Sequence, residues 1–249
     1  MGSTGTSQRT RVTINCDMGE AYGSWKMGPD EELMPLIDLA NVACGFHGGD
    51  PVVMRKTVQL AKKHSVPVGA HPSLPDREGF GRRHIDLSPD DLFAQLVYQI
   101  GALEGMLRSE NMKLNHIKTH GYLWRYCEAS EAHCKAVMRA IQVFDVPMLV
   151  IAGTRMEKMA AEMGIPYIPE FYPDIYYNEE GKLMSILRDG RVNLEDVQPK
   201  VERIIVHDEV VAKTTGKPVK MNFAGRDFSC CIHSDLPRQF DLLPYRTYY

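Results

Sequence analysis

Carboxylate and imidazole side chains recur in this sequence directly after short apolar segments that are typical of buried strands. In parallel α/β proteins the carboxyl ends of the strands meet at one edge, and ligands bind there. The runs 12–16, 39–43, 67–70 and 116–119 lead into Asp17, Glu20, His47, Asp50, His71 and His120. A single residue of this kind could be structural, but four such strand ends in the first half of the chain indicate an enzyme.

Carboxylates and imidazoles gathered at one edge can perform two kinds of chemistry. They can transfer protons, because their surroundings set which group is the acid and which is the base. Alternatively, Asp17, His71 and His120 could bind a divalent metal ion that activates water. Each residue follows a different strand, so the spacing does not decide; we favour acid–base catalysis without a tightly bound metal ion and keep the metal-assisted alternative open. A nucleophilic pair of Cys44 and His47 has thinner support, because the two lie close in sequence.

Other residues near this edge could contact a substrate. Lys118 lies two positions before His120, so both side chains point to the same face of a strand, and the amine could bind a carboxylate or polarise a carbonyl group. Arg82 belongs to a long irregular loop, 72–84, whose arginines could bind a carboxylate or a phosphate. Later strand ends lead into Asp174, His233 and Asp235.

Strand-like and helix-like segments alternate six or seven times along the chain, which predicts a parallel β/α barrel; an open, doubly wound sheet is the second choice. We expect one domain over 11–249 after a disordered tail over 1–10. Asp50 and Pro51 are typical of a helix start. No Gly-x-Gly-x-x-Gly or P-loop pattern supports nucleotide binding. Further helices are expected at 88–109, 128–143, 154–163 and 193–213, an irregular excursion with a hairpin at 176–189, and a turn at 217–220.

The composition is that of a globular protein, with 44% hydrophobic and 24% charged residues. A net charge of −3 makes nucleic acid an unexpected partner. No apolar run approaches the ~20 residues that span a bilayer, and the small polar start of the chain does not resemble a secretory signal. The six cysteines form no Cys-x-x-Cys pair, which favours reduced thiols and a cytoplasmic location.

Five motifs together resemble the LamB/YcsF family, which includes the A subunit of the ATP-dependent bacterial 5-oxoprolinase and fungal lactam-utilisation proteins. They are Asn-Cys-Asp-Met-Gly-Glu at 15–20, Asn-Val-Ala-Cys-Gly-Phe-His-Gly-Gly-Asp-Pro at 41–51, Gly-Ala-His-Pro-Ser at 69–73, Gly-Phe-Gly-Arg-Arg at 79–83 and Tyr-Gln-Ile-Gly-Ala at 98–102. The resemblance implies a seven-stranded, TIM-like β/α barrel related to sugar-deacetylase barrels, and hydrolytic opening of a cyclic amide such as 5-oxoproline. It also implies kinase-like partner subunits that use ATP to phosphorylate the amide oxygen.

The family resemblance and the strand ends together define the expected site. Catalytic roles around the ring are expected for Asp17, Glu20, His47, His71 and His120. Substrate contacts are expected for Asn15, Cys44, Asp50, Arg82, Lys118, Asp174, His233 and Asp235. We expect no tightly bound cofactor, with a divalent metal ion as the open alternative, and aromatic residues in the tail could support a homo-oligomer.

Two further motifs of the family are altered in this sequence. The family's Lys-Pro-His-Gly-Ala-Leu-Tyr is Lys-Thr-His-Gly-Tyr-Leu-Trp at 118–124, so Tyr122 and Trp124 are larger. The family's Phe-Ala-Asp-Arg-Ala-Tyr is Phe-Tyr-Pro-Asp-Ile-Tyr at 171–176, so Ile175 replaces an arginine. These changes keep the acid–base groups and alter the groups that shape the pocket. We therefore expect ring opening on a ring other than 5-oxoproline, or activity without kinase partners.

Two other functions are alternatives to a hydrolase of cyclic amides. A metal-dependent deacetylase of an N-acetyl sugar or a similar amide would hold a stoichiometric metal ion. A non-catalytic subunit that binds a ligand for a partner enzyme would not need the acid–base set, and the presence of that set argues against it. A hydrolase of cyclic amides is the function that we expect.

Overall fold

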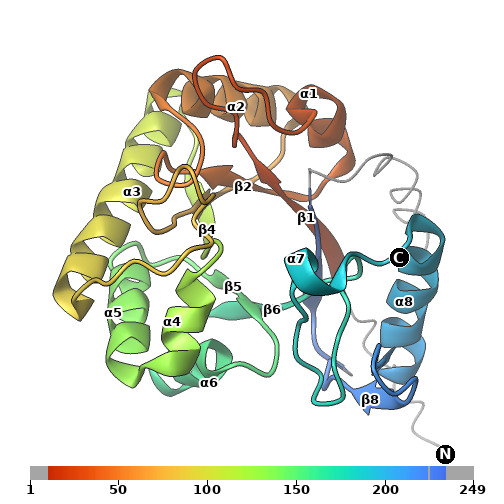
Figure 1. Ribbon diagram of the computed structural model, residues 1–249. Helices are drawn as coiled ribbons and strands as arrows, with labels where there is room; N and C mark the ends of the chain where they lie inside the picture. The colour runs from red at the N-terminus through yellow and green to blue at the C-terminus, as the bar shows by residue number, and fades with distance from the viewer. Residues whose placement is uncertain (1–10, 224, 234–249) are drawn as a thin grey trace, which may run out of the picture.

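The computed structural model describes residues 11–223 and 225–233, and its centre is a closed barrel of seven parallel strands (Figure 1). Their order around the barrel is β1-β2-β3-β4-β5-β6-β9, so the last strand closes the ring between β1 and β6. The predicted seven-stranded β/α barrel is confirmed. The predicted tail and Asp235 lie outside the described residues. The strands are β1 (Val12–Met18), β2 (Leu39–Ala43), β3 (Val68–His71), β4 (Leu114–Lys118), β5 (Met148–Ile151), β6 (Tyr167–Phe171) and β9 (Phe228–Ile232).

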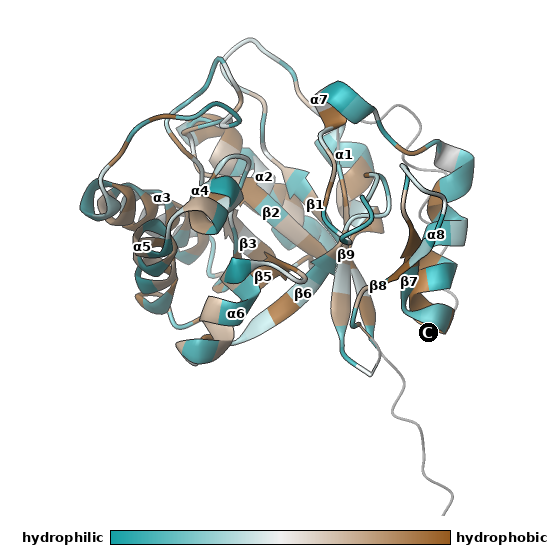
Figure 2. Ribbon diagram, turned by 60° about the horizontal axis from the view of Figure 1, so that its bottom comes forward, coloured by the Kyte–Doolittle hydropathy of each residue, from teal (hydrophilic) through white to brown (hydrophobic). Residues whose placement is uncertain are grey.

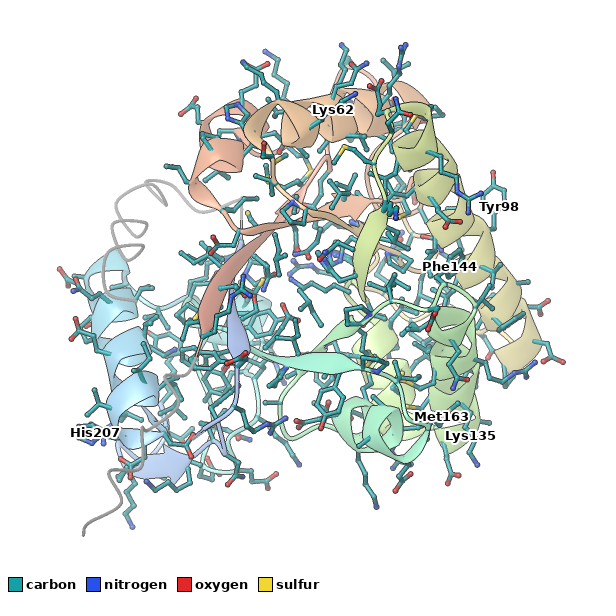
Figure 3. The ribbon with its side chains drawn as sticks, turned by 180° about the vertical axis from the view of Figure 1, so that it is seen from behind. Lys62, Tyr98, Lys135, Phe144, Met163 and His207 are labelled. Carbon is teal, nitrogen blue, oxygen red and sulfur yellow. The ribbon has the colours of Figure 1, made fainter. Side chains whose placement is uncertain are left out.

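Helices cover the outside of the barrel. Figure 3 shows from behind that Lys62, Tyr98 and His207 lie on outer faces of their helices. The helix predicted at 128–143 is present as α5, which begins three residues later, and the prediction missed the separate short helix α4 that precedes it. The helices are α1 (Asp30–Leu33), the 3-10 helix η1 (Met34–Leu36), α2 (Pro51–His64), α3 (Pro89–Ser109), α4 (Leu123–Ala129), α5 (Glu131–Gln142), α6 (Arg155–Glu162), α7 (Ile186–Asp189) and α8 (Leu194–His207).

Capping side chains set where two of the long helices begin. Asp50 Oδ1 accepts hydrogen bonds from the N–H groups of Val52 at 2.8 Å and Val53 at 2.9 Å, which confirms the predicted start of α2. Ser88 Oγ accepts a hydrogen bond from the N–H of Asp91 at 3.1 Å at the start of α3. Each of these two helices therefore begins after the loop that follows its strand. The carboxyl ends of the strands stay free to present side chains at the mouth of the barrel, the end where these strand ends meet.

The helix predicted at 193–213 ends earlier than expected. Asp208 adopts the left-handed conformation, with φ of 55°, and the helix stops at His207. Aspartate tolerates this conformation better than most residues, so no glycine marks the end of the helix. The chain then forms a two-stranded antiparallel sheet from β7 (Glu209–Val211) and β8 (Pro218–Lys220), where a turn was predicted.

Polar side chains fill part of the barrel interior. Asn41 Nδ2 donates to Asn15 Oδ1 at 2.8 Å and to Asp17 Oδ1 at 2.9 Å. Asn15 Nδ2 in turn donates to Ser229 Oγ at 2.8 Å, and His116 Nε2 lies 2.8 Å from Asn41 Oδ1. Buried polar groups are costly unless they are paired, and these pairs link β1, β2, β4 and β9 across the interior.

Gly69 on β3 leaves the space that His116 occupies. A Cβ atom at Gly69 would lie 2.2 Å from His116 Nε2. Gly69→Ala should therefore displace the imidazole and lower the free energy of unfolding by about 1–3 kcal/mol, measured by urea denaturation. Gly101→Ala is the matched control, because a Cβ there meets nothing within 4 Å and alanine favours the helix by about 0.5–1 kcal/mol. Unchanged stability of the Gly69 variant would contradict this packing.

Candidate active site at the mouth of the barrel

A cavity of about 310 Å³ opens at the carboxyl ends of the barrel strands. This volume lies at the lower end of the ~300–1,000 Å³ that is usual for small-molecule sites, so the cavity suits a small ligand. Two predicted residues, Glu20 and His47, do not line the cavity and lie beside residues that do. The predicted site residues that line it are Asp17, His71, Arg82, Lys118, His120 and His233.

Lys118 and two carboxylates form a buried ionic group at this cavity. Lys118 Nζ lies 2.9 Å from Asp17 Oδ1 and 3.4 Å from Glu170 Oε1. Burial alone would lower the pKa of Lys118, but the neighbouring acidic groups, first of all Asp17, raise it well above its usual value. Burial alone would raise the pKa of Asp17, but His71 and Lys118 hold it well below its usual value. Both groups are therefore charged at neutral pH.

Three imidazoles gather next to this ionic group. The rings of His47 and His120 are stacked, with centroids 3.7 Å apart and planes inclined by 4°. His71 meets the ring of His120 edge-on, with centroids 4.9 Å apart. Glu20 Oε1 lies 3.2 Å from His47 Nε2. Burial lowers the pKa of His47 and of His120 well below the ordinary value, so both rings are neutral at pH 7.

Backbone carbonyl groups set the tautomers of two of these rings. His71 Nδ1 lies 2.8 Å from Lys118 O, and His120 Nε2 lies 2.7 Å from Phe80 O. A carbonyl oxygen only accepts, so each of these nitrogens carries the hydrogen. The opposite nitrogens, His71 Nε2 and His120 Nδ1, face each other at 3.0 Å. Two lone pairs at this distance repel, so the pair favours uptake of a proton or a cation between the rings.

The same rings form a set of donors that could hold a metal ion. One nitrogen or oxygen from each of Glu20, His47, His71 and His120 lies within 4.8 Å of the others. The charge of the region also suits a cation, because the carboxylates of Asp17, Glu20 and Glu170 outnumber the cationic groups of Lys118 and Arg82. Three negative charges against two positive charges leave an excess of one when the imidazoles are neutral. Imidazole and carboxylate donors are those that divalent transition metals prefer.

A second group of candidate ligands, Asp17, Cys231 and His233, is less suited to a metal ion. Lys118 Nζ lies 2.9 Å from Asp17 Oδ1 and 2.9 Å from Cys231 Sγ. The ammonium group therefore occupies the place beside these donors that a cation would take. Burial also raises the pKa of the Cys231 thiol well above its usual value, which opposes the thiolate that a metal requires.

The loop 72–84 positions His120 and Arg82 at the mouth. The N–H of His120 donates to Pro72 O at 2.9 Å, which ties the end of β4 to this loop. The guanidinium group of Arg82 lies 5.4 Å from the centre of the Phe80 ring and lines the cavity. Its Nε atom is buried and has no hydrogen-bond partner within the described part of the chain. An anionic group of a ligand could supply that partner.

Asp174 is buried and orients His233 toward the site. His233 Nδ1 donates to Asp174 Oδ2 at 2.7 Å, and Arg191 Nη1 donates to the same oxygen at 2.9 Å. Burial alone would raise the pKa of Asp174, but the charge and hydrogen bond of His233, with help from Arg191, lower it. Asp174 therefore stays ionised and holds the imidazole at the cavity, without lining the cavity itself.

Three of the expected substrate contacts lie away from the cavity. Asp50 caps α2, and Asn15 belongs to the hydrogen-bond network of the barrel interior. The Cys44 thiol is buried and donates to Val42 O at 3.3 Å. Burial raises the pKa of Cys44 to about 12, so the structure gives no support to Cys44 as a nucleophile.

Sequence reasoning missed Glu170, which belongs to the ionic group, and Tyr172 and Cys231, which contact it. Tyr172 Oη donates to Glu170 Oε2 at 3.0 Å. A signal for Glu170 was present, because it is the one charged residue in the sequence of β6. Cys231 alternates with Ser229 and His233 along the last strand, so all three point to the same face. No signal in the sequence showed that this face would meet Lys118.

The neutral imidazole of His116 should make the fold sensitive to mild acid. Burial, aided by the charge of Lys118, lowers the pKa of His116 to about 3. Between this value and the unfolded value of about 6.5, the unfolded chain binds more protons than the folded chain. Stability is therefore complete above about pH 6.5 and falls as the pH drops through this window. The melting temperature should decrease between about pH 7.5 and about pH 5, measured by calorimetry.

The variant His116→Gln tests this assignment, because it removes the titrating group and keeps a polar side chain. It should reduce the acid dependence by the share of one titrating group and leave the share of His47 and His120, whereas His133→Gln, at a half-buried histidine of α5 remote from the barrel interior, should not change it. A melting temperature that stays constant over this range in the unaltered chain would show that His116 is not held neutral.

The closed barrel and the titratable groups at its mouth define a β/α-barrel protein with a candidate acid–base site. The chain matches the model of the LamB/YcsF family over residues 12–244 and belongs to this family. The resemblance inferred from the five motifs is thereby confirmed. In the described part of the chain, none of the helices combines the length and the apolar character needed to cross a membrane.

Relatives and a solved structure support this assignment. The chain is 44% identical over 235 residues to the lactam utilization protein lamB of Emericella nidulans, covering 94% of this chain and 92% of the relative. It is 40% identical over 239 residues to the A subunit of 5-oxoprolinase from Pyrococcus furiosus, with 94% and 92% covered. The crystal structure of a lactam utilization protein from Thermus thermophilus matches with a TM-score of 0.83 at 37% identity, over 90% of each chain.

Proposed function

We propose that this chain takes part in lactam or 5-oxoproline metabolism as a hydrolase that opens the amide bond of a cyclic amide. The relatives named for lactam utilization and for 5-oxoprolinase support this role. The observation that carries the proposal is the position of His71 at the cavity, with Nε2 3.3 Å from Asp17 Oδ2. An amide is a poor electrophile, so its hydrolysis requires a base for water and fixed charges near the developing oxyanion.

The contacts of His71 suit the part of a general base that later becomes the acid. In the proposed reaction His71 Nε2 takes a proton from water while the water oxygen bonds to the amide carbon. The Asp17 carboxylate at 3.3 Å stabilises the resulting imidazolium, and the hydrogen bond from Nδ1 to Lys118 O holds the ring. His71 then gives this proton to the amide nitrogen of the lactam as the carbon–nitrogen bond breaks, which yields an open-chain amino acid. His120, 3.0 Å from His71, can share this proton.

We further propose that kinase-like partner subunits activate the amide oxygen with ATP. Several relatives are named as one lettered subunit of 5-oxoprolinase, which supports the existence of partners. The unpartnered Nε of Arg82 at the cavity suits the anionic phosphoryl group on the activated oxygen, and a second water molecule would release this group as inorganic phosphate after the ring has opened. All six cysteines are free and buried, which fits a reducing compartment, and we propose the cytoplasm as the location.

Ring opening itself tests the proposed function. The purified chain should be incubated with a panel of lactams and cyclic imides, with and without ATP and the partner subunits, and the released primary amine measured. Release of amine that depends on this chain supports the proposal. Ligand binding without ring opening under every condition would favour a non-catalytic binding role. Activity on 5-oxoproline alone, strictly dependent on added subunits, would contradict the expectation of a different ring.

The metal-assisted alternative rests on the two facing lone pairs of His71 and His120. We propose that Glu20, His47, His71 and His120 would be the ligands, instead of the set with Asp17 that the strand ends suggested. A bound divalent ion would supply a Lewis acid and an activated water, as in a deacetylase. Asp17, held by Lys118 at 2.9 Å, would keep its carboxylate beside His71.

Thermal stability in the presence of metal ions distinguishes a bound ion from a shared proton. Zinc or manganese at about 100 times its dissociation constant should stabilise the chain by about 2.7 kcal/mol, seen as a higher melting temperature. The variant His120→Gln should lose this response, and His133→Gln should keep it. No response to any divalent ion would leave the shared proton as the explanation of the short distance between the rings.

A further inference from the structure

One side of the cavity is apolar and comes from a single segment of the chain. Ile175, Leu183, Met184 and Ile186 line the cavity and belong to the excursion between β6 and α8; we call these four side chains the apolar wall. Figure 1 shows α7 at the edge of the barrel opening, and Figure 2 shows it above the ends of the barrel strands. The same cavity is lined by the acid–base residues.

The segment that carries the apolar wall is held in a defined conformation. Tyr177 and Leu183 form a short antiparallel bridge, as expected for the predicted hairpin. The N–H of Met184 donates to Tyr176 O at 2.9 Å, and Ile175 is only 5% exposed. The wall therefore exists before a ligand binds, and binding does not have to order it.

Three basic side chains near the apolar wall are already engaged within the described structure, and Arg82 and Arg125 line the same cavity outside the wall. Arg191 and His233 both donate to Asp174, at 2.9 Å and 2.7 Å. Lys200 Nζ donates to Ile175 O at 2.6 Å. A charged substituent placed against the wall would lose its water without gaining an opposite charge, which is costly. An apolar group in the same place would gain stability from burial.

We propose that the ring opened at this site has apolar carbon atoms beyond those of a five-membered lactam, and no charge on the side away from the amide. A larger, alkyl-substituted or fused ring would meet this description, whereas 5-oxoproline would not. This proposal rests on the proposed function and specifies its substrate class. The apolar wall acts as the determinant of specificity, while the acid–base residues stay the same.

Binding of a homologous series of rings tests the proposal without requiring turnover. The ligands are 2-pyrrolidinone, δ-valerolactam, ε-caprolactam and 5-oxoproline, titrated into the full purified chain by calorimetry. Each added methylene group should tighten binding about four-fold, because burial of one CH₂ is worth about 0.8 kcal/mol. The carboxylate of 5-oxoproline should weaken binding relative to 2-pyrrolidinone, because the apolar wall offers it no opposite charge and Arg82 is assigned to the activated amide oxygen.

Two variants test whether the gain in affinity per added methylene group comes from the apolar wall. Leu183→Gln and Ile186→Gln alter half-buried side chains and should each reduce the gain per methylene, whereas Val206→Gln, at a residue of α8 that is 69% exposed, should not. Melting curves establish that each variant is folded. Two results would overturn the proposed ring specificity without affecting the proposed hydrolase function. One is tighter binding of 5-oxoproline than of the larger rings; the other is a gain in affinity per methylene group that the wall variants do not change. Binding of no ring at all would overturn the proposed function itself.

Discussion

Replacement of His71 by asparagine should lower kcat by about 10²–10⁴-fold, the range expected for loss of a general base. Asparagine keeps a donor near the position of Nδ1, so the hydrogen bond to Lys118 O can persist. It removes Nε2, the atom that lies 3.3 Å from Asp17 and faces the cavity. The effect should therefore appear in kcat, with KM changed little, in an assay of amine release from the best lactam of the panel.

The matched control for this variant is His133→Asn. His133 on α5 has its ring nitrogens near Ser130 and Leu87 O, far from the cavity, and its loss should leave kcat unchanged. Asp17→Asn should also lower kcat, because it removes the charge that stabilises the imidazolium. Full activity of His71→Asn would refute the assignment of His71 as the base.

Replacement of Lys118 by methionine should lower the free energy of unfolding by about 3–5 kcal/mol, the usual cost of removing one partner of a buried ion pair. Methionine fills a similar volume, so the effect would come from charge. The carboxylates of Asp17 and Glu170 would remain, only 5% and 2% exposed, without the ammonium group at 2.9 and 3.4 Å. Urea denaturation at neutral pH measures the loss.

Two comparisons separate this electrostatic cost from a general packing defect. Adding Glu170→Gln to the Lys118 variant should recover part of the stability, because one uncompensated charge is removed. Lys158→Met, at a side chain that is 78% exposed and paired with Glu162 on α6, should change stability by no more than about 0.5 kcal/mol. Equal effects at Lys118 and Lys158 would show that the buried pair is not what stabilises the interior.

The mouth of the barrel could be predicted from the sequence because it depends on a local signal. In a parallel barrel every strand ends at the same edge, so a polar residue after an apolar run is placed without knowledge of its neighbours. Asp17, His71 and His120 were found in this way and lie at one cavity. The helix start at Asp50 was found from capping chemistry alone. Their roles in ring opening stay a prediction.

The contacts inside the barrel could not be predicted, because they depend on which strands face each other after closure. Cys231 lies beside Lys118 although 113 residues separate them. Glu170 stands in an apolar strand, where its partner across the interior is not visible in the sequence. The end of α8 was also missed, because the left-handed Asp208 stops the helix without the glycine that normally signals it.

The position of β9 between β1 and β6 has a consequence for how the chain is synthesised. Asn15 finds its partner Ser229 only after 214 further residues have been added. Until then the edges of β1 and β6 carry unpaired backbone groups, and such edges readily pair with other chains. A nascent or truncated chain that lacks the last strand therefore exposes two unpaired strand edges, and we expect it to depend on chaperones or to aggregate.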